Sequence, residues 1–239
     1  MPGDERREPD LERMAERWVG HSHREGRLSR DFRFCPRCGG ELPSDREMAF
    51  RCPSPECGYR GTRALVFARN ARFEIRAGTL YHYSVGAALF CRFVEEQEDR
   101  VLLLRRATHP VGVFTVPSGH WDVSDENPLD AARREVREET GLEPPPPWQL
   151  VSEPNELLED ACRRGSDYHY WHFYQARCRP EATDLTLPTD HRRRVIGESD
   201  MIGWLPISEV VSGTFPLSKP AGHFLGKILG VDLPNVLPR

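Results

Sequence analysis

Four cysteines crowded into one short segment constrain the fold of this chain more than any other feature. They form a Cys-x2-Cys pair, Cys35 and Cys38, and a Cys-x4-Cys pair, Cys52 and Cys57, with 13 residues between the pairs. Residues 34–62 contain too few apolar side chains for a core of their own. Tetrahedral zinc takes four thiolates at about 2.3 Å, and a glycine after each pair relieves the tight turn. The spacing therefore predicts a small zinc ribbon whose closed shell stabilises the fold and performs no chemistry.

Two alternatives for the four cysteines stay open, namely an iron–sulfur cluster and a site that has lost its metal. Zinc ribbons also bind nucleic acid or proteins, and arginines at positions 33, 37, 51, 60 and 63 surround this one. The net charge of −4 gives no general attraction to phosphate backbones. We therefore expect these arginines to be solvated and nucleic acid not to be the main partner. The scattered Cys91, Cys162 and Cys178 are expected to be small buried side chains, because a disulfide framework does not fit a chain of this kind.

A larger unit is expected to start near Tyr81. Apolar and aromatic runs predict strands at residues 85–94, 101–106, 113–116, 168–178 and 201–205, the first two joined as a hairpin. A helix is predicted over residues 127–141, with Asn127 as its cap, Pro128 at its first position and Gly141 ending it. Further helices are predicted at 207–211, at 219–229 and, from apolar residues at helical spacing, at 10–19. The N-terminal helix is expected to dock onto the rest of the chain.

These elements divide the sequence into five predicted segments. They are an N-terminal helix and tail at 1–32, the zinc ribbon at 33–66, a linker at 67–80, a large α/β domain at 81–212 and a C-terminal helical extension at 213–239. No run approaches the roughly 20 apolar residues of a membrane span, and no apolar stretch follows the charged N-terminus. We expect a cytoplasmic protein without a secretory signal or a membrane partner.

Three glutamates share one side of the helix predicted at 127–141. With Val136 on the buried side, Glu139, Glu135 and Glu138 fall at about −60°, −100° and −160°. Like charges at this spacing cost roughly 0.2–0.5 kcal/mol per pair, and no lysine or arginine projects within that arc. A divalent cation would offset the repulsion, and magnesium or manganese suits hard oxygen ligands. The alternative is a solvated face in which Arg134 pairs with Glu138, and helix geometry alone leaves both readings open.

The residues around this helix resemble the signature of the Nudix hydrolases, Gly-x5-Glu-x7-Arg-Glu-aliphatic-x-Glu-Glu-x-Gly-aliphatic. Every fixed position of its second half matches, at Arg134, Glu135, Val136, Glu138, Glu139, Gly141 and Leu142, and seven residues separate Glu126 from Arg134. Six residues instead of five separate Gly119 from Glu126, and the usual Pro-Gly-Gly is Pro117-Ser118-Gly119. The loop before the helix therefore has one extra residue.

This resemblance implies an α/β/α sandwich around a mixed sheet, which hydrolyses a nucleoside diphosphate linked to another moiety. It implies that Glu135 and Glu139 are the main ligands of Mg²⁺ or Mn²⁺, with Glu138 beside them and the backbone carbonyl of Ser118 as a further ligand. A glutamate of this group, Glu138 or Glu139, can take the proton of a metal-bound water. The remaining matches are expected to be structural, with Arg134 and Glu126 holding loop and helix together beside Gly119 and Gly141.

An acidic residue outside the signature completes the predicted site. Several Nudix enzymes take such a carboxylate from a loop shortly before a late strand that bears a tryptophan, and Glu198 occupies that place before residues 201–205. Asp200 is the nearest competitor, and Glu156, Glu159 and Asp160 lie on another loop. Arg106, Trp121 and Tyr170 are the candidate substrate-binding residues.

The substrate and the rival function stay open at this point. A zinc ribbon ahead of a Nudix domain resembles the NADH pyrophosphatase arrangement, but that family's aromatic and proline array is absent after the signature, where residues 143–148 read Glu-Pro-Pro-Pro-Pro-Trp. The rival is a non-catalytic Nudix-fold regulator that senses a nucleotide and acts through the ribbon. Because such regulators tend to lose signature glutamates, the intact set favours an enzyme. A homodimer is expected, since Nudix proteins are often dimers.

Overall fold

A computed structural model describes residues 9–16, 32–43, 49–67, 70–93, 97–107, 110–178 and 199–234. The chain divides into two compact units. Unit 1 comprises Met1–Tyr83 and Glu159–His169, and unit 2 comprises Ser84–Leu158 and Tyr170–Arg239. The five segments predicted from the sequence did not include the return of Glu159–His169 to the N-terminal unit. None of the described helices combines the length and the apolar character needed to cross a lipid bilayer.

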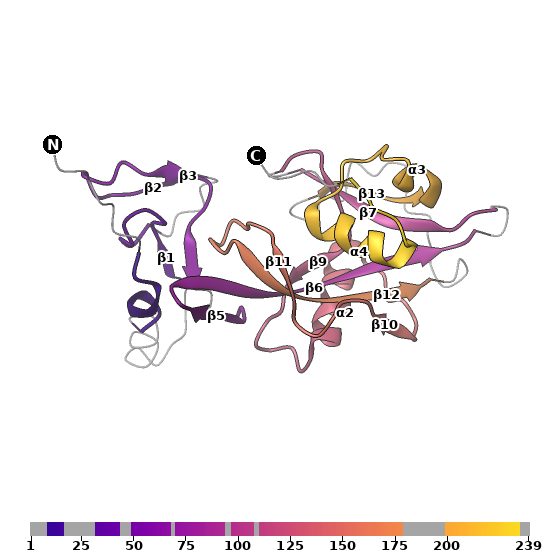
Figure 1. Cartoon of the computed structure of the whole chain (residues 1–239), viewed down its shortest axis with the longest axis horizontal. Coiled ribbons are helices and arrows are strands. Elements are labelled where there is room, and N and C mark those ends of the chain that lie inside the picture. The colour runs from indigo at the N-terminus through magenta and orange to yellow at the C-terminus, as the bar shows by residue number, and fades with distance from the viewer. Residues whose placement is uncertain are drawn as a thin grey trace. The chain divides into compact units, whose positions relative to one another are not determined.

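The N-terminal part of unit 1 is built from two short antiparallel strand pairs (Figure 1). β1 (Phe32–Phe34) pairs with β4 (Leu65–Phe67), and β2 (Phe50–Arg51) pairs with β3 (Arg60–Gly61). Residues 11–16 form a helical turn, whose Leu11 and Met14 are buried in a cluster with Phe34, Phe67 and Leu80. The docked N-terminal helix was therefore predicted correctly for the residues that the structure describes, while Trp18 lies outside them.

The rest of unit 1 brings distant parts of the sequence together. β5 (Phe73–Arg76) forms a hairpin with the start of β6 (Thr79–Cys91), through a turn in which Ala77 and Gly78 both have positive φ. The segment Glu159–His169 is bound to the β4 region by backbone hydrogen bonds from Ala64 and Val66. Gly165 has φ +92°, and a Cβ there would lie 2.6 Å from the carbonyl oxygen of Ala64. Only glycine permits this close approach.

Unit 2 is built on a sheet of order β10-β12-β6-β7-β13. Its strands are β10 (Trp148–Leu150), β12 (Tyr168–Arg177), β7 (Arg100–Arg106) and β13 (Ser199–Pro206), together with β6. The shorter β8 (Phe114–Thr115), β9 (Ser118–His120) and β11 (Glu156–Glu159) pair with β7, β6 and β12 respectively. The predicted hairpin of residues 85–94 and 101–106 is confirmed, because Phe90 pairs with Val101. A parallel bridge from Phe114 to Leu217 makes the pairing mixed.

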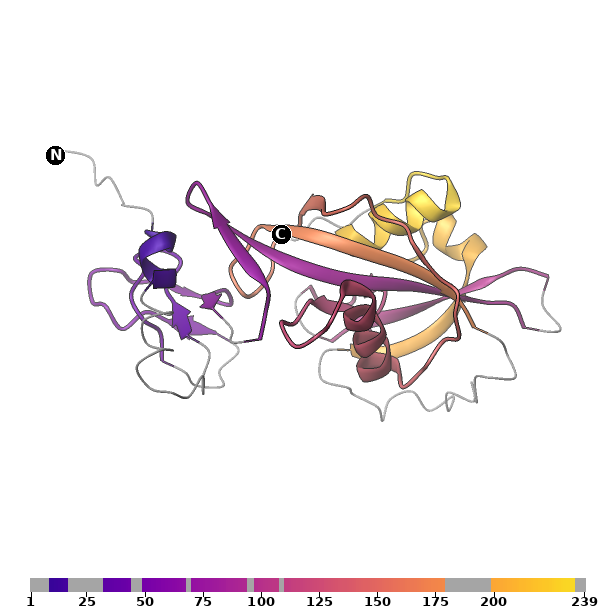
Figure 2. The same ribbon diagram turned by 90° about the horizontal axis from the view of Figure 1, so that it is seen from below.

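Helices cover both faces of this sheet (Figure 2). α2 (Pro128–Thr140) buries Val136 on one face, in a cluster with Leu89, Leu102 and Leu104. On the other face lie α3 (Ile207–Val211) and α4 (Lys219–Leu229), and the rings of Phe224 and Phe173 stack at 4.3 Å. The predicted α/β/α sandwich is confirmed. α4 belongs to the core of this unit, although the sequence analysis had set 213–239 apart as an extension.

The ends of α2 are fixed as the sequence predicts. The Asn127 side chain accepts a hydrogen bond from the Asp130 amide at 3.0 Å, and Pro128 opens the first turn. Gly141 has φ 74°, and its N–H donates to the Arg137 carbonyl. Because both ends are fixed, the rotation of the glutamates about the helix axis is fixed as well.

Candidate functional site

Two carboxylates of α2 converge on the backbone of β9. An oxygen of Glu139 accepts a hydrogen bond from the Ser118 amide at 2.9 Å. A Cβ added to Gly119 would lie 2.3 Å from the carboxyl carbon of Glu135 and 2.4 Å from both of its oxygens. The missing side chain of Gly119 therefore leaves the space that the Glu135 carboxylate occupies. Ser118 and Gly119 are held in turn by pairing with Gly86 and Val85 of β6.

The surroundings of Glu135 favour a bound cation. Its side chain is 14% exposed, and burial raises the pKa of its carboxyl group, while the neighbouring Arg134 acts in the opposite direction. Glu135 and Glu139 are separated by one helical turn, and Glu135 lies against Gly119 while Glu139 binds the amide of the adjacent Ser118, so both offer hard oxygen ligands to the same stretch of backbone. This donor set fits magnesium or manganese, which take carboxylates and keep several waters.

Arg134 ties the loop before α2 to the helix itself. Its guanidinium donates to both oxygens of Asp125, at 3.1 and 3.0 Å, and to the backbone carbonyl of His120 at 3.2 Å. It also contacts Glu135 at 2.7 Å and Glu138 at 3.1 Å. The expected role of Arg134 is thus visible in the structure. No lysine or arginine was expected within the carboxylate arc to offset the repulsion, but the long Arg134 side chain reaches around the helix and does so.

The acidic partner in this clamp is Asp125, where the sequence analysis expected Glu126. The Asp125 side chain is 9% exposed, whereas Glu126 is an exposed residue. Five residues separate Gly119 from Asp125, as the signature requires, so a signal for the correct partner was present in the sequence. The extra residue of the loop therefore lies between this acid and the helix. It was predicted to lie between Gly119 and the acid.

Glu138 lies at the outer edge of the group. Its side chain is 58% exposed, and it forms the i, i+4 pair with Arg134 that was considered as the alternative for this face. The structure therefore contains both features, an arginine-paired edge and two converging carboxylates. A role for Glu138 in metal binding or proton transfer stays a prediction.

The candidate substrate-binding residues lie on three different elements. Trp121 follows β9 and packs in a cluster on the α2 side of the sheet, where its ring lies edge-on to His172 at 5.4 Å. Tyr170 is two residues from His172 on β12, and alternation along the strand gives it the same face. Arg106 ends β7, and its amide donates to the Val113 carbonyl. Burial lowers the pKa of His172, which disfavours the charged form of this ring.

Glu198 lies outside the described residues, and its role stays a prediction. Two of the acids that could replace it are held in ion pairs. Asp200 accepts two hydrogen bonds from Arg105, at 2.8 and 3.1 Å. Glu156 contacts His223 at 2.6 Å and Lys227 at 2.8 Å. Both acids therefore have a structural function already.

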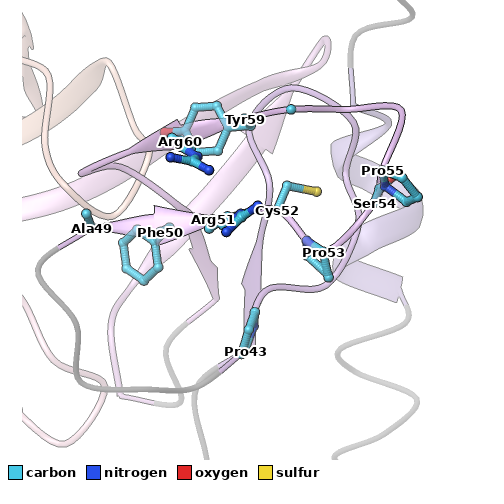
Figure 3. A pocket seen from close by; sticks show the side chains of 11 residues that line it. Pro43, Ala49, Phe50, Arg51, Cys52, Pro53, Ser54, Pro55, Tyr59 and Arg60 are labelled. Atoms are coloured by element: carbon cyan, nitrogen blue, oxygen red, sulfur yellow. The ribbon is translucent and has the colours of Figure 1, made fainter.

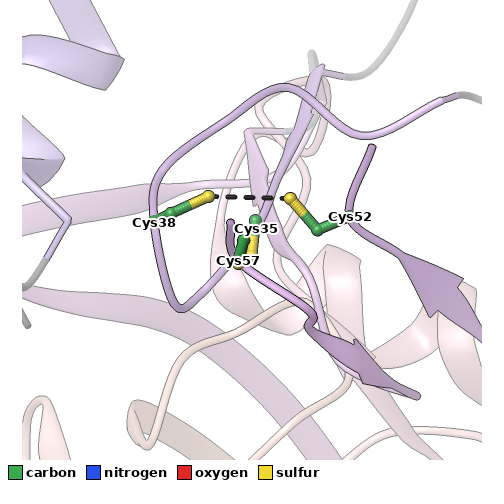
Figure 4. A group of neighbouring side chains, drawn as sticks. All are labelled: Cys35, Cys38, Cys52 and Cys57. Atoms are coloured by element: carbon green, nitrogen blue, oxygen red, sulfur yellow. Dashed lines mark hydrogen bonds between the residues drawn. The ribbon is translucent and has the colours of Figure 1, made fainter. Parts of the chain in front are cut away.

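The four clustered cysteines meet at one point of unit 1 (Figure 4). Their sulfur atoms all lie within 4.8 Å of one another, and the Cys35–Cys57 and Cys38–Cys52 pairs are both 3.6 Å apart. A tetrahedral shell with bonds of 2.3 Å requires a separation of about 3.8 Å, so the group fits zinc. The glycines after each pair, at positions 39 and 58, have φ 68° and 62°, which confirms the expected turns. Burial raises the pKa of Cys35 to about 12, so a metal ion would have to displace its proton.

A hollow lies beside these cysteines on the β2–β3 hairpin. Phe50, Arg51, Tyr59 and Arg60 contribute to its lining, and Figure 3 shows the two guanidinium groups among the aromatic and proline side chains. The Arg33 guanidinium lies 5.8 Å from the centre of the Phe50 ring. Arginine and aromatic side chains thus occur together here, while the expectation that the arginines are only solvated is not tested.

Comparison with known proteins finds one matching family model and several similar solved structures. A family model described as the NUDIX domain matches residues 82–225, which is more than half of the chain. The NUDIX domain of Shewanella oneidensis NrtR complexed with ADP ribose has 23% identity and a TM-score of 0.46, covering 65% of this chain and 89% of that one. A C. elegans Ap4A hydrolase binary complex has 18% identity and a TM-score of 0.43, covering 62% and 95%. S. oneidensis NrtR complexed with a 27mer DNA has 23% identity and a TM-score of 0.46, and the match covers 61% of this chain. This chain spans only 59% of the length of that relative.

Proposed function

The chain belongs to the Nudix family of hydrolases that act on phosphoric anhydrides, and on that premise we propose that it is a divalent-metal-dependent pyrophosphohydrolase. Its proposed substrate is a nucleoside diphosphate linked to another moiety, as in a dinucleotide or a nucleotide sugar. One observation carries the proposal, namely the convergence of Glu135 and Glu139 on the Ser118–Gly119 backbone. A salt-bridged surface helix would not need a glycine that leaves room for a buried carboxylate.

The proposed ligands of Mg²⁺ or Mn²⁺ are the carboxylates of Glu135 and Glu139, with Glu138 at the edge and the Ser118 carbonyl as a further oxygen. Such an ion, when bound, neutralises charge on the diphosphate oxygens and lowers the pKa of a coordinated water. The protein's contribution is to hold the two carboxylates in place before the substrate binds. Arg134 does this by fixing Glu135 from one side while it holds Asp125 in the loop.

Hydrolysis requires a water to add to one phosphorus while the bridging P–O bond breaks. The proton of this water goes to a carboxylate, for which we propose Glu139 or Glu138 within the helix, or Glu198 from outside it. The nucleotide base is proposed to stack near Trp121 and Tyr170, on the face where His172 already contacts Trp121. Arg106 is proposed to meet a phosphate group.

The four-cysteine cluster is proposed to hold a structural zinc ion. Its support is the near-tetrahedral spacing of the sulfur atoms, together with the small apolar cluster around Cys35 and Cys52. A segment with so small a core gains its folding free energy from the metal. The ribbon is therefore proposed to shape unit 1, separately from hydrolysis in unit 2.

The test is a hydrolysis assay of the full chain with added Mg²⁺ or Mn²⁺. NADH, ADP-ribose, dinucleoside polyphosphates and nucleoside triphosphates serve as substrates, and products are separated by chromatography. We expect metal-dependent release of a nucleoside monophosphate from at least one substrate, and its near-complete loss in Glu139→Gln. Glu143→Gln is the matched control, because Glu143 is a 74% exposed glutamate that pairs with Arg137 just beyond the end of the same helix.

Two results would contradict the proposal. One is the absence of turnover with every substrate and both ions, and the other is a Glu139→Gln variant as active as Glu143→Gln. Saturable binding of ADP-ribose without any hydrolysis would support the alternative, a non-catalytic regulator that senses a nucleotide and acts through the ribbon. The expected homodimer is a separate proposal, which sedimentation equilibrium measures directly.

A further inference from the structure

A second group of metal-ligand side chains lies in unit 1, apart from the four cysteines. It includes His82 on the first half of β6, Cys162 in the segment Glu159–His169, and His169 at the start of β12. One ligand atom of each lies within 4.8 Å of the others. The Nδ1 atom of His82 is 3.5 Å from the Cys162 sulfur, and the two imidazole rings lie edge to face, with centroids 5.5 Å apart.

These distances resemble those between ligands of one tetrahedral zinc ion. With Zn–S about 2.3 Å and Zn–N about 2.0–2.1 Å, a thiolate sulfur and an imidazole nitrogen lie about 3.6 Å apart. We propose that His82, Cys162 and His169 form a second zinc site of this protein. Imidazole and thiolate are ligands that zinc prefers, and a hard ion such as magnesium would not select them. The fourth position of a tetrahedral shell would be filled by another side chain or by water.

The outer contacts of the group suit a metal site. The His169 ring donates a hydrogen bond to the backbone carbonyl of Asp160, which fixes the orientation of the ring, as is usual for metal-binding histidines. Burial raises the pKa of the Cys162 thiol, and the Arg63 guanidinium, which donates to the Cys162 carbonyl at 3.0 Å, acts in the opposite direction. The same guanidinium is paired with Asp167 at 2.7 Å, which offsets its repulsion of a bound cation.

Burial and chain connectivity show what such a site would do. His82 is fully buried, His169 is 2% exposed and Cys162 is partly buried, so the group is largely shielded from solvent. The ligands are 80 and 87 residues apart along the chain, counting from His82 to Cys162 and to His169. An ion held by all three would fix the returning segment onto β6, where the Ser166 hydroxyl already donates to the Leu80 carbonyl at 2.7 Å. Cross-links that close long loops restrict the unfolded chain most strongly.

Zinc stoichiometry of the full chain tests this proposal, independently of any hydrolysis. The protein is purified without chelator or added metal, and bound zinc is counted by native mass spectrometry and by elemental analysis. We expect two zinc ions per chain in the wild type, one in Cys162→Ala and one in a Cys35→Ser, Cys52→Ser variant. Cys178→Ala, which removes a buried cysteine of unit 2, is the matched control and is expected to keep both ions.

The alternative is a hydrogen-bonded cluster of neutral side chains without a metal. That reading is supported, and the proposal is overturned, if the wild type binds only the zinc that the Cys35, Cys52 variant loses. A Cys162→Ala protein that still binds two ions also overturns it. If Cys162→Ala does not fold, as judged by circular dichroism, His169→Gln serves in its place, and the same counts decide the result.

Discussion

The substitution Gly119→Ala tests the site geometry most directly. A methyl group at this position would lie 2.4 Å from the carboxylate oxygens of Glu135, whereas an ordinary contact needs about 3.4 Å. The carboxylate must therefore move by about 1 Å. A displacement of this size at a reacting centre costs about 100-fold in rate. We therefore expect kcat of Gly119→Ala to fall by about two orders of magnitude.

The stability of the same variant should change little. The clash involves the far end of a flexible side chain, and Gly119 lacks the positive φ that would strain an alanine. We expect the free energy of unfolding in urea to stay within about 1 kcal/mol of the wild type. Gly203→Ala on β13 is the matched control, because its Cβ would meet neighbours only at 3.8 Å. It should retain both stability and activity.

A double-mutant cycle with Glu135→Gln separates this mechanism from a general disturbance of the loop. If Gly119→Ala acts by displacing the Glu135 carboxylate, it should cost little more once that carboxylate has lost its charge. The measurement is kcat/KM for all four proteins on the best substrate in saturating Mg²⁺. Full activity of Gly119→Ala, or losses that add in full across the cycle, would refute the reasoning.

Three further predictions concern other contacts of unit 2. Glu139→Gln should lower kcat by more than the roughly 10- to 100-fold that is lost when a residue supporting a metal ligand is removed. Glu138→Gln should cost much less, because Glu138 is mostly exposed. Similar losses of kcat in the two variants would contradict the assignment of Glu139 as a main metal ligand. Asn127→Ala should destabilise the protein by about 1 kcal/mol in urea unfolding, and an unchanged midpoint would argue against the cap. Burial raises the pKa of Glu156, but hydrogen bonds, with Lys227 first, lower it overall. Because the native pKa lies below the unfolded one, the wild type should be more stable than Glu156→Gln above about pH 4.3 and should lose this advantage as the pH falls. A difference in the free energy of unfolding that stays constant between roughly pH 3 and 7 would contradict this.

Local signals explain why the helices of unit 2 could be predicted from the sequence. Asn127, Pro128 and Gly141 determine the ends of α2 through contacts with residues no more than four positions away. α3 and α4 likewise have the predicted bounds. β9, β10 and β11 were not predicted, because each has only three or four residues. Such strands carry too few residues for an alternating pattern to be recognised.

The site was predicted in its helical part and less well in its loop. Glu135 and Glu139 follow from helix periodicity and from the signature, and the structure places their carboxylates against the adjacent residues Gly119 and Ser118, while their role as metal ligands stays a prediction. The partner of Arg134 depends on how a loop with an extra residue folds, which spacing within the helix does not determine. Asp125 reaches the guanidinium, and Glu126 at the next position is exposed.

The two cysteine-containing groups of unit 1 differ in how far the spacing of residues in the sequence predicts them. In the ribbon, each pair of thiols comes from one tight turn, so spacing alone predicted that all four would meet. Cys162 was expected to be only a small buried side chain, because His82 lies 80 residues before it, and the six residues between Cys162 and His169 exceed the two or four residues between paired cysteines. Their meeting depends on Glu159–His169 returning to the N-terminal unit, which Gly165 permits by its close approach to Ala64. A substitution of Gly165 should therefore separate the ligands of the proposed second site and leave the four cysteines together, so a Gly165→Val chain that still binds two zinc ions would show that this approach does not assemble the site.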